Sequence, residues 1–209
     1  MIRVPSLVHG QGYPFHTMNH DPLYDDRELV RAVLCGDTRA FERLVQTYQR
    51  LCWHIVGRMV RNSDDVRDLC QETFLRAYQQ LHQFRFECPL KSWIGRIAFS
   101  IALRHLERER RSITLDAEAA DELAIESSGE IVDIESVWIG EQRAATVRAA
   151  VDALPPMLKT LLSLYYLEEL SITQIAQITD MSAGTIKSHL FRARARLREW
   201  LERRGVREP

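Results

Sequence analysis

Hydroxyl and cationic side chains recur at helical spacing in the segment that follows Ser182. When residues are placed about 100° apart around a helix, these side chains point away from an apolar stripe that contains Ile186 and Leu190. Such groups can meet base edges and phosphates of DNA, and free N–H groups at the helix start can hold a phosphate. The set is Ser182, Gly184, Thr185, Lys187, Ser188, His189 and Arg192. It predicts a helix that reads duplex DNA; the alternative is the solvated basic face of an ordinary bundle.

Carboxylates form a second set, in the first half of the chain. On one side of a predicted helix, whose other side is apolar, lie Asp64, Asp65, Asp68 and Glu72. Like charges at these spacings repel, so the set favours docking onto a basic partner rather than helix stability. The alternative is a solvated face whose acids favour the positive helix N-terminus. We expect no metal or acid–base site here, because no histidine or further carboxylate is set to converge on these acids from a neighbouring motif.

Aromatic and cationic residues interleave over a loop and the helix after it. Single-stranded nucleic acid is held by this combination, because bases stack on aromatic faces while cations follow the backbone. The alternative is that aromatics such as Trp93 and Phe99 belong to the core, and that the cations complement the helix dipole. The set is Phe84, Arg85, Phe86, Lys91, Trp93, Arg96, Phe99, Arg104, His105, Arg108, Arg110 and Arg111.

The cysteines and the remaining motifs indicate no catalytic centre. Cys35, Cys52, Cys70 and Cys88 include no CxxC pair, which fits zinc poorly. Cys52 and Cys70 fall on apolar helical faces and are predicted to be core thiols, whereas Cys88, in a loop, is predicted to be the one to oxidise. With no nucleophile, metal or phosphate-loop constellation, we expect no enzyme activity, no metal and no cofactor.

All three sets depend on helices, because apolar residues recur at intervals of three and four. Ser63 is expected to cap the acidic helix, and Ser171 with Gln174 forms a capping box for a short helix. A turn at 179–181, with Asp180 in a left-handed conformation, joins this helix to the one after Ser182. The pair predicts a helix-turn-helix.

The fold class expected is therefore all-α, with two small helical domains. Residues 25–111 form an N-terminal helical bundle and residues 141–203 a C-terminal helix-turn-helix domain. Residues 112–140, which carry acids but no Lys or Arg, form a flexible acidic linker, and residues 1–24 a disordered N-terminal extension, with Met1 or Met18 as the start. The net charge of -1 conceals this segregation.

Localisation is predicted from absences. No apolar run approaches the roughly 20 residues that a membrane span needs. The first residues lack the basic start and apolar stretch of a secretory signal. We expect a soluble cytoplasmic protein without membrane insertion.

Three stretches resemble extracytoplasmic-function (ECF) sigma factors of the sigma-70 superfamily of bacteria. Residues 65–78 resemble region 2.2, residues 84–111 resemble regions 2.3 and 2.4, and residues 154–197, with the motif Gly184-Thr-Ile-Lys-Ser-His-Leu-Phe-Arg-Ala-Arg194, resemble region 4. The absence of further domains between the two modules separates this group from primary sigma factors. The resemblance implies an alternative sigma factor that binds core RNA polymerase and directs transcription initiation at minus-ten and minus-thirty-five promoter elements.

The resemblance also assigns residues. The acidic face, which would contact the clamp of the largest polymerase subunit, is Asp65, Asp68, Gln71, Glu72 and Phe74. The minus-ten set, which would melt and capture that element, is Trp93, Arg96, Ser100, Arg104, His105, Arg108 and Arg111. The minus-thirty-five set is the group of residues from Ser182 to Arg192 given above. Partners implied are core RNA polymerase and promoter DNA, with an anti-sigma factor or a regulatory kinase as further candidates.

Three residues depart from the family pattern: Arg67 where a third acid is frequent, Ser100 where Asn is common, and Asp180 where Gly is usual. Arg67 prompts the hypothesis that phosphorylation of Ser63 or Thr73 adds the missing negative charge.

A rival function is a stand-alone helix-turn-helix transcriptional regulator with a helical sensing domain, because residues 185–190 also resemble response-regulator output domains. A receiver domain would need alternating strands and helices, and residues 25–111 have no such pattern. A pure interaction protein, such as an anti-sigma factor, is a third option that the basic C-terminal helix opposes.

Overall fold

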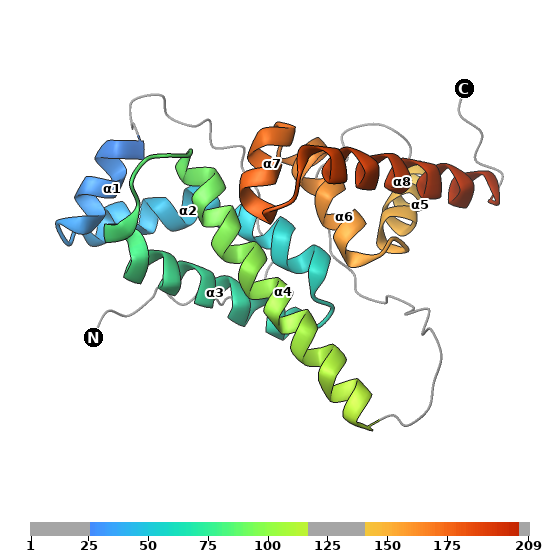
Figure 1. The fold of residues 1–209 in the computed structure, drawn as a ribbon, viewed down its shortest axis with the longest axis horizontal. Helices are drawn as coiled ribbons and strands as arrows, with labels where there is room; N and C mark the ends of the chain where they lie inside the picture. The colour runs from blue at the N-terminus through green and yellow to red at the C-terminus, as the bar shows by residue number, and fades with distance from the viewer. Residues whose placement is uncertain (1–25, 117–140, 205–209) are drawn as a thin grey trace.

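The structure is a computed structural model that describes residues 26–116 and 141–204 (Figure 1). Every regular element in these two ranges is helical, which confirms the all-α prediction. None of the helices in the described ranges is long and apolar enough to cross a membrane. The predicted extension at 1–24 and most of the predicted linker, 117–140, lie outside the described residues.

Four helices and one short turn make up the N-terminal half. They are α1 (Asp26–Leu34), α2 (Thr38–Met59), α3 (Ser63–Gln80), the 3-10 turn η1 (Leu81–Gln83) and α4 (Leu90–Asp116). Asp37 caps α2, since Oδ1 of Asp37 accepts from the backbone N–H of Arg39 at 2.8 Å. The helix α4 continues to Asp116, past the domain boundary expected at Arg111.

Asn62, not Ser63, caps α3. Oδ1 of Asn62 accepts from the backbone N–H of Asp64 at 2.9 Å, and Ser63 is the first helical residue. The prediction chose the wrong one of two adjacent residues that both suit an N-cap.

The apolar faces of α2, α3 and α4 form a continuous core, in which Ile55, Phe74 and Ile94 are fully buried. Cys52 and Cys70 lie in this core, as predicted. Burial raises the pKa of Cys70 to about 12. Both thiols are therefore core residues with little reactivity.

Five elements make up the C-terminal half: α5 (Glu141–Asp152), α6 (Pro156–Leu162), η2 (Ser163–Leu167), α7 (Ile172–Thr179) and α8 (Ala183–Glu202). The sequence predicts one helix over 157–167, but its second part is a π-helical turn, with the N–H of Glu168 donating to the carbonyl of Ser163 at 3.0 Å. Glu169 then adopts a φ of 52°. This turn and the left-handed residue after it determine where Glu168 projects.

The helix-turn-helix prediction is confirmed in its local detail. The hydroxyl of Ser171 accepts from the N–H of Gln174 at 3.2 Å, and Oε1 of Gln174 accepts from the N–H of Ser171 at 2.9 Å, which is the predicted capping box. Asp180 ends α7 with a φ of 59°, in the left-handed conformation expected of the turn.

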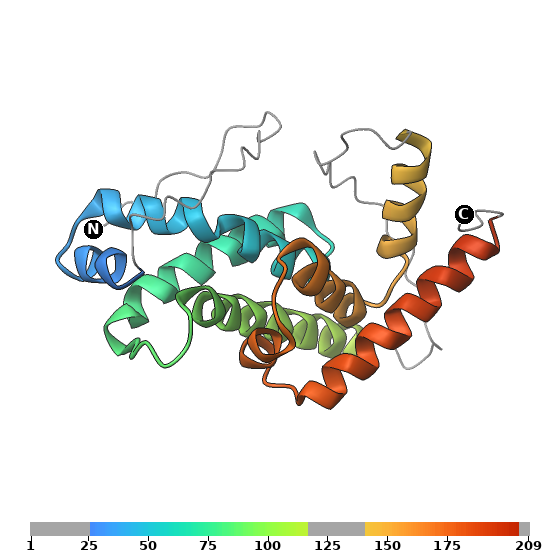
Figure 2. The same cartoon turned by 90° about the horizontal axis from the view of Figure 1, so that it is seen from above.

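The two halves pack against each other. The helix α7 packs on α4, while α6 and η2 pack on α2, so that the orange elements lie against the green helix α4 and the blue-to-cyan helix α2 (Figures 1 and 2). A Cβ added to Gly95 on α4 would lie 2.9 Å from Cδ1 of Ile178 on α7, so any side chain at this crossing would require Ile178 to shift. The predicted division into two domains gave no indication of this packing, which we call the interdomain seam.

Candidate functional site

The start of α8 is exposed and capped by its own hydroxyls. Ser182 is the N-cap, and its Oγ accepts from the N–H of Thr185 at 3.1 Å. Gly184 beside it is exposed. The cap uses one hydroxyl and leaves the other backbone N–H groups of the first turn pointing outward.

The face of α8 that lies opposite its buried stripe matches the predicted minus-thirty-five set. Lys187, Ser188 and Arg192 are exposed, while Ile186 and Leu190 are buried. Arg192 donates to Oγ of Ser188 at 3.3 Å, which aligns two of these polar groups along the helix. His189 departs from the set: it is half-buried, and its Nδ1 has no hydrogen-bond partner among the described residues.

The acids of α3 project outward from the core. Asp68 is exposed and Asp65 and Glu72 are half-exposed. Glu72 accepts from Arg76 at 2.7 Å, one turn away. Arg67, the residue that departs from the family pattern, lies 3.4 Å from Asp64 and partly neutralises it. Of the remaining members, Gln71 is half-buried.

Phe74, predicted as a polymerase contact, lies in the core. It is 1% exposed, so in this conformation it packs α3 against the core and offers no surface to a partner. Thr73 is equally unavailable to a kinase, because its hydroxyl is buried and donates to the carbonyl of Leu69 at 2.8 Å. Ser63 is exposed at the start of α3, so phosphorylation there stays a prediction.

His105 converges on the acids, contrary to expectation. Its Nε2 lies 3.8 Å from Oδ2 of Asp65 and 3.3 Å from Oε1 of Glu109. The three side chains could each offer one ligand atom within 4.8 Å of the others. The sequence did not predict this cluster because His105 was assigned to the DNA-binding face of α4, whereas its side chain points toward α3. The absence of a metal stays a prediction.

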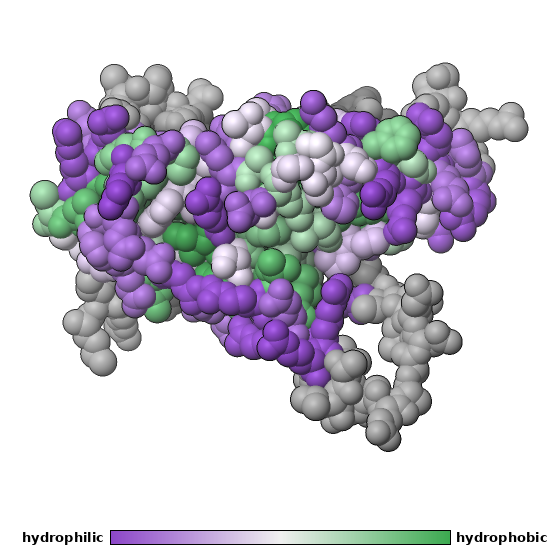
Figure 3. Space-filling view, in the orientation of Figure 1, coloured by the Kyte–Doolittle hydropathy of each residue, from purple (hydrophilic) through white to green (hydrophobic). Residues whose placement is uncertain are grey.

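The cations of α4 gather on its C-terminal half. Arg104, Arg108 and Arg111 are exposed, and Ser100 is exposed one turn before them. Nε of Arg104 donates to the carbonyl of Ser100 at 3.2 Å, so the guanidinium lies along the helix. A shallow groove between α3 and α4 is lined by Glu72, Arg76, Ile101, Arg104, Glu107, Arg108 and Arg111. In Figure 3 the lower edge of the molecule, where α3 and α4 lie in the orientation of Figure 1, is strongly hydrophilic.

The aromatics divide between core and surface. Phe84 and Phe99 are buried, so the core interpretation holds for them. Trp93 is half-buried, with its ring 5.2 Å from that of Phe84. Trp93 is thus the aromatic of the minus-ten set that retains an accessible face.

Comparison with known proteins identifies the family. The family model "Sigma-70 region 2" matches residues 44–112, and "Sigma-70, region 4" matches residues 144–197. The RNA polymerase sigma-H factor of Pseudomonas aeruginosa is 36% identical over 173 residues, which is 81% of this chain and 90% of that protein. The chain belongs to the ECF sigma factors of the sigma-70 family.

Further relatives agree with this assignment. The ECF RNA polymerase sigma-E factors of Escherichia coli K12 and Salmonella typhimurium LT2 are each 36% identical over 173 residues, again 81% of this chain and 90% of each protein. This sigma factor is an alternative sigma factor that directs promoter recognition. The rival function of a stand-alone regulator is not favoured, because region 2 accounts for the N-terminal half that a sensing domain would occupy.

Two solved structures share the fold. The sigma factor RpoE of Bartonella quintana, in complex with the anti-sigma factor NepR, aligns with a TM-score of 0.60 at 22% identity, over 79% of this chain and 98% of that one. CnrH, in complex with the cytosolic domain of CnrY, aligns with a TM-score of 0.59 at 23% identity, over 85% of this chain and 97% of that one.

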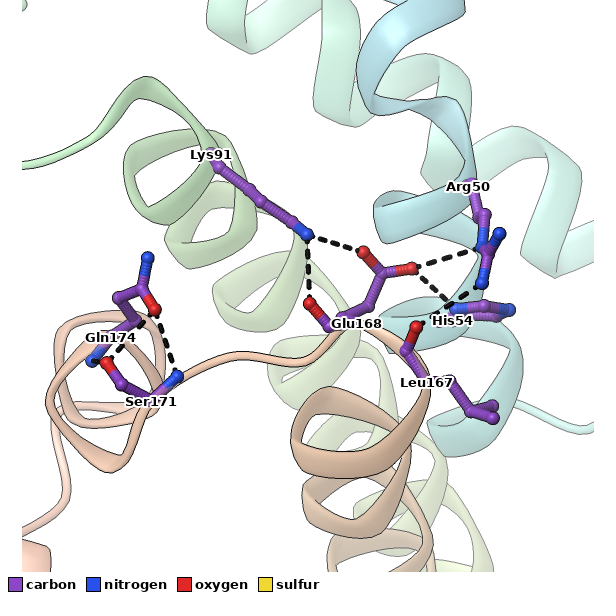
Figure 4. Close-up of polar contacts among 7 residues, drawn as sticks. All are labelled: Arg50, His54, Lys91, Leu167, Glu168, Ser171 and Gln174. Carbon is purple, nitrogen blue, oxygen red and sulfur yellow. Dashed lines mark hydrogen bonds and ion pairs between the residues drawn. The ribbon is translucent and has the colours of Figure 1, made fainter. Parts of the chain in front are cut away.

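The interdomain seam of this sigma factor contains a buried acid that sequence reasoning missed. Glu168, with a side chain 7% exposed, accepts at Oε1 from His54 at 2.8 Å and pairs at Oε2 with Lys91 at 2.8 Å (Figure 4). Nε of Arg50 lies 3.5 Å from Oε1, and the same arginine donates to the carbonyl of Leu167 at 3.3 Å. One carboxylate from the C-terminal half thus binds three basic residues of α2 and α4.

The basic residues decide the ionisation of Glu168. Burial alone would raise its pKa, but hydrogen bonds from His54 and Lys91, together with their charges, lower the pKa below its ordinary value. No local pattern could have identified this cluster, because His54 and Glu168 are 114 positions apart.

Arg96 of the minus-ten set also lies in the seam. Its Nε donates to the carbonyl of Gln177 on α7 at 2.6 Å. Arg96 is therefore held by the C-terminal half in this conformation, whereas Arg104 and Arg108 donate to carbonyls within α4 itself.

Proposed function

We propose that this sigma factor starts transcription through three separate surfaces, one for polymerase and two for DNA. The observation that carries the proposal is the sorting of exposed charge: carboxylates on α3, and cations on the C-terminal half of α4 and on α8. Residues 25–111 act as the region 2 domain and residues 141–203 as the region 4 domain, with the acidic segment 112–140 between them passing through a basic channel of the polymerase.

The acidic face of α3 docks on the clamp of the largest polymerase subunit. Asp65, Asp68 and Glu72 supply the charge, and Arg76 aligns Glu72 along the helix. Oppositely charged surfaces speed encounter and fix the register of docking. The apolar side of α3, with Phe74 at its centre, is anchored in the core, so the acids are presented by a rigid helix.

The exposed side of α4 captures the separated strand of the minus-ten element. Arg104, Arg108 and Arg111 follow the phosphates, and Trp93 offers a ring on which a base can stack. Ser100 carries a short hydroxyl where a longer amide is common in the family, so base choice at its position relies on a smaller hydrogen-bonding group.

The helix α8 enters the major groove of the minus-thirty-five element with its N-terminal end. In helix-turn-helix proteins the first residues of the recognition helix meet base edges, while flanking cations hold phosphates. Thr185 and Ser188 are placed to meet base edges, and Lys187 and Arg192 to hold phosphates.

The protein itself contributes binding energy and strand separation rather than covalent chemistry, and it acts in the cytoplasm, with the polymerase. Its activity is proposed to be controlled by an anti-sigma factor, a class of partner that holds the neighbour RpoE, or by phosphorylation at Ser63.

The test combines binding and transcription. Purified wild-type chain is mixed with core polymerase, and complex formation and promoter-dependent transcripts are measured. The variant Asp65→Asn/Asp68→Asn/Glu72→Gln is expected to lose complex formation yet keep duplex binding through α8. If this variant binds core polymerase as the wild type does, the role given to the acidic face is wrong.

A further inference from the structure

A histidine and two carboxylates meet where α3 packs against α4, beside the acidic face. His105 and Glu109 lie one turn apart on α4, and Asp65 approaches them from the first turn of α3. The two helices run side by side (Figures 1 and 2), so their packing determines how far apart the three side chains lie. The cluster is therefore formed by tertiary structure and includes an imidazole, unlike a row of acids along one helix.

The imidazole of His105 has a ring nitrogen that the rest of the chain leaves unsatisfied. The side chain is 17% exposed, and its Nε2 is shielded from solvent and has no hydrogen-bond partner among the described residues. Oε1 of Glu109 at 3.3 Å and Oδ2 of Asp65 at 3.8 Å lie near it without accepting a hydrogen bond from it. A buried nitrogen without a partner is costly, and an ion held between the three side chains removes that cost.

The spacing of the three ligand atoms suits a metal ion. Zn²⁺ binds imidazole nitrogen and carboxylate oxygen at about 2.0 to 2.2 Å, so two ligand atoms of a tetrahedral ion are about 3.4 Å apart. The nitrogen-to-oxygen distances of 3.3 and 3.8 Å are close to this value, and all three atoms lie within 4.8 Å of one another. The Asp65 side chain is 40% exposed, so it has room to rotate inward. Water can complete the coordination, as in other zinc sites with three protein ligands.

The types of ligand select the class of ion. An imidazole with two carboxylates suits divalent ions of the first transition row, such as Zn²⁺, whereas Mg²⁺ and Ca²⁺ prefer oxygen ligands. Asp65 and Glu109 together balance the charge of a divalent ion. Asp68, exposed one turn further along α3, adds to the local negative potential that attracts a cation.

We propose that Asp65, His105 and Glu109 bind a divalent transition-metal ion, and that the bound ion competes with core polymerase for Asp65. The competition rests on the function proposed for the acidic face of α3, whereas the metal site itself does not. A carboxylate that coordinates the ion is neutralised by it and held toward α4, so it no longer offers a charge to a basic partner. The site thereby links the supply of such an ion to polymerase docking.

The test removes the ligand that belongs to no proposed binding surface. Glu109→Gln keeps the size of the side chain and removes its charge. Glu107→Gln makes the same change in net charge at an exposed position of α4 outside the cluster, and is the matched control. His105→Gln removes the imidazole as a second, independent variant. Circular dichroism verifies that the helices of each full-length variant are retained.

Affinity for Zn²⁺ is measured by isothermal titration calorimetry of the metal-free chains, with and without excess Mg²⁺. Glu109→Gln and His105→Gln are expected to bind Zn²⁺ at this site roughly tenfold or more weakly than the wild type, since even a group that only orients a metal ligand contributes that much. Glu107→Gln should match the wild type. Thiols and histidines elsewhere in the chain are common to Glu107→Gln and Glu109→Gln, so the difference between these two variants reports the cluster. Equal Zn²⁺ affinities in Glu109→Gln and the wild type, or loss of this binding in excess Mg²⁺, would overturn the metal site.

Titration of core polymerase with each chain tests the competition. Saturating Zn²⁺ should weaken the complexes of the wild type and Glu107→Gln roughly tenfold, because loss of one charge at an interface lowers affinity, and should leave that of Glu109→Gln unchanged. Equal effects of Zn²⁺ on the wild type and Glu109→Gln would reject the competition. Failure of the proposed function looks different: the variant Asp65→Asn/Asp68→Asn/Glu72→Gln would then bind polymerase normally without Zn²⁺, and the calorimetry would still decide the metal site.

Discussion

Glu72 on α3 and Glu168 in the seam are the same residue type in opposite settings. Glu72 is half-exposed and pairs with Arg76 one turn away, whereas Glu168 is buried and pairs with residues far away in the sequence. An exposed pair contributes little to stability and remains available to a partner, while a buried acid fixes the elements that surround it. The exposed carboxylates are the ones proposed to bind another molecule, whereas the buried one joins the two halves of the chain.

The largest expected effect comes from removing the exposed carboxylates of α3. Neutralising Asp65, Asp68 and Glu72 together should weaken core-polymerase binding by roughly a hundredfold or more, because charge pairs at an interface couple strongly. The free energy of unfolding should change little. Titration against core polymerase and urea unfolding measure the two quantities. A large loss of stability with unchanged binding would reverse the roles given to the two settings.

The second prediction compares single neutral variants of the two glutamates. Glu168→Gln should lower the free energy of unfolding by about 2 kcal/mol, less than for a fully buried ion pair because Arg50 and Lys91 reach solvent. Glu72→Gln should lower it by less than about 0.5 kcal/mol. Thermal and urea unfolding of both variants provide the measurement, and equal losses would contradict the distinction.

The dependence of DNA binding on salt extends the comparison to the exposed cations of α8. Lys187 and Arg192 are exposed, so their contacts with phosphates should be screened by salt. Changing either residue to Ala should weaken binding of a minus-thirty-five duplex and reduce the slope of log affinity against log salt by about one. Arg198→Ala, at an exposed cation two turns further along α8, is the matched control. A variant at Lys187 with an unchanged slope would remove that residue from the phosphate contacts.

The smallest expected effect is a weakening of the interdomain seam by acid. The pKa of Glu168 is lower in the folded chain than the ordinary value of 4.5, so its stabilising contribution is complete above that value. The contribution is lost as pH falls through the lowered pKa. Wild-type chain should therefore become larger in X-ray scattering below about pH 4.5, while Glu168→Gln should be large at every pH. A wild-type size that stays constant as the carboxylate protonates would show that Glu168 does not hold the interdomain seam together.

Local signals predicted the helix-turn-helix because each of its features depends on neighbouring residues. Ser171 and Gln174 are three positions apart and identify the start of α7, and Asp180 suits the left-handed turn. The same reasoning gave the outward direction of Lys187 and Arg192, since the buried stripe of α8 is regular. The choice between Asn62 and Ser63 failed because both residues can cap.

Features that depend on distant residues were not predictable. The seam brings together segments about a hundred residues apart, and the π turn that aims Glu168 leaves no periodic signal in a run of apolar residues. The positions of His105 and Phe74 were missed for a related reason: the family pattern gives residue roles, but only the packing of α3 on α4 decides which side chains face inward.

The missing side chain at Gly95 has a consequence for how such a protein can evolve. One nucleotide change suffices to convert a glycine codon to an alanine codon, and the added methyl group would press on Ile178 without touching any residue assigned to DNA or polymerase. A single methyl group at this position is therefore enough to change how tightly α4 and α7 pack, while the side chains on the exposed faces of α3 and α8 stay the same.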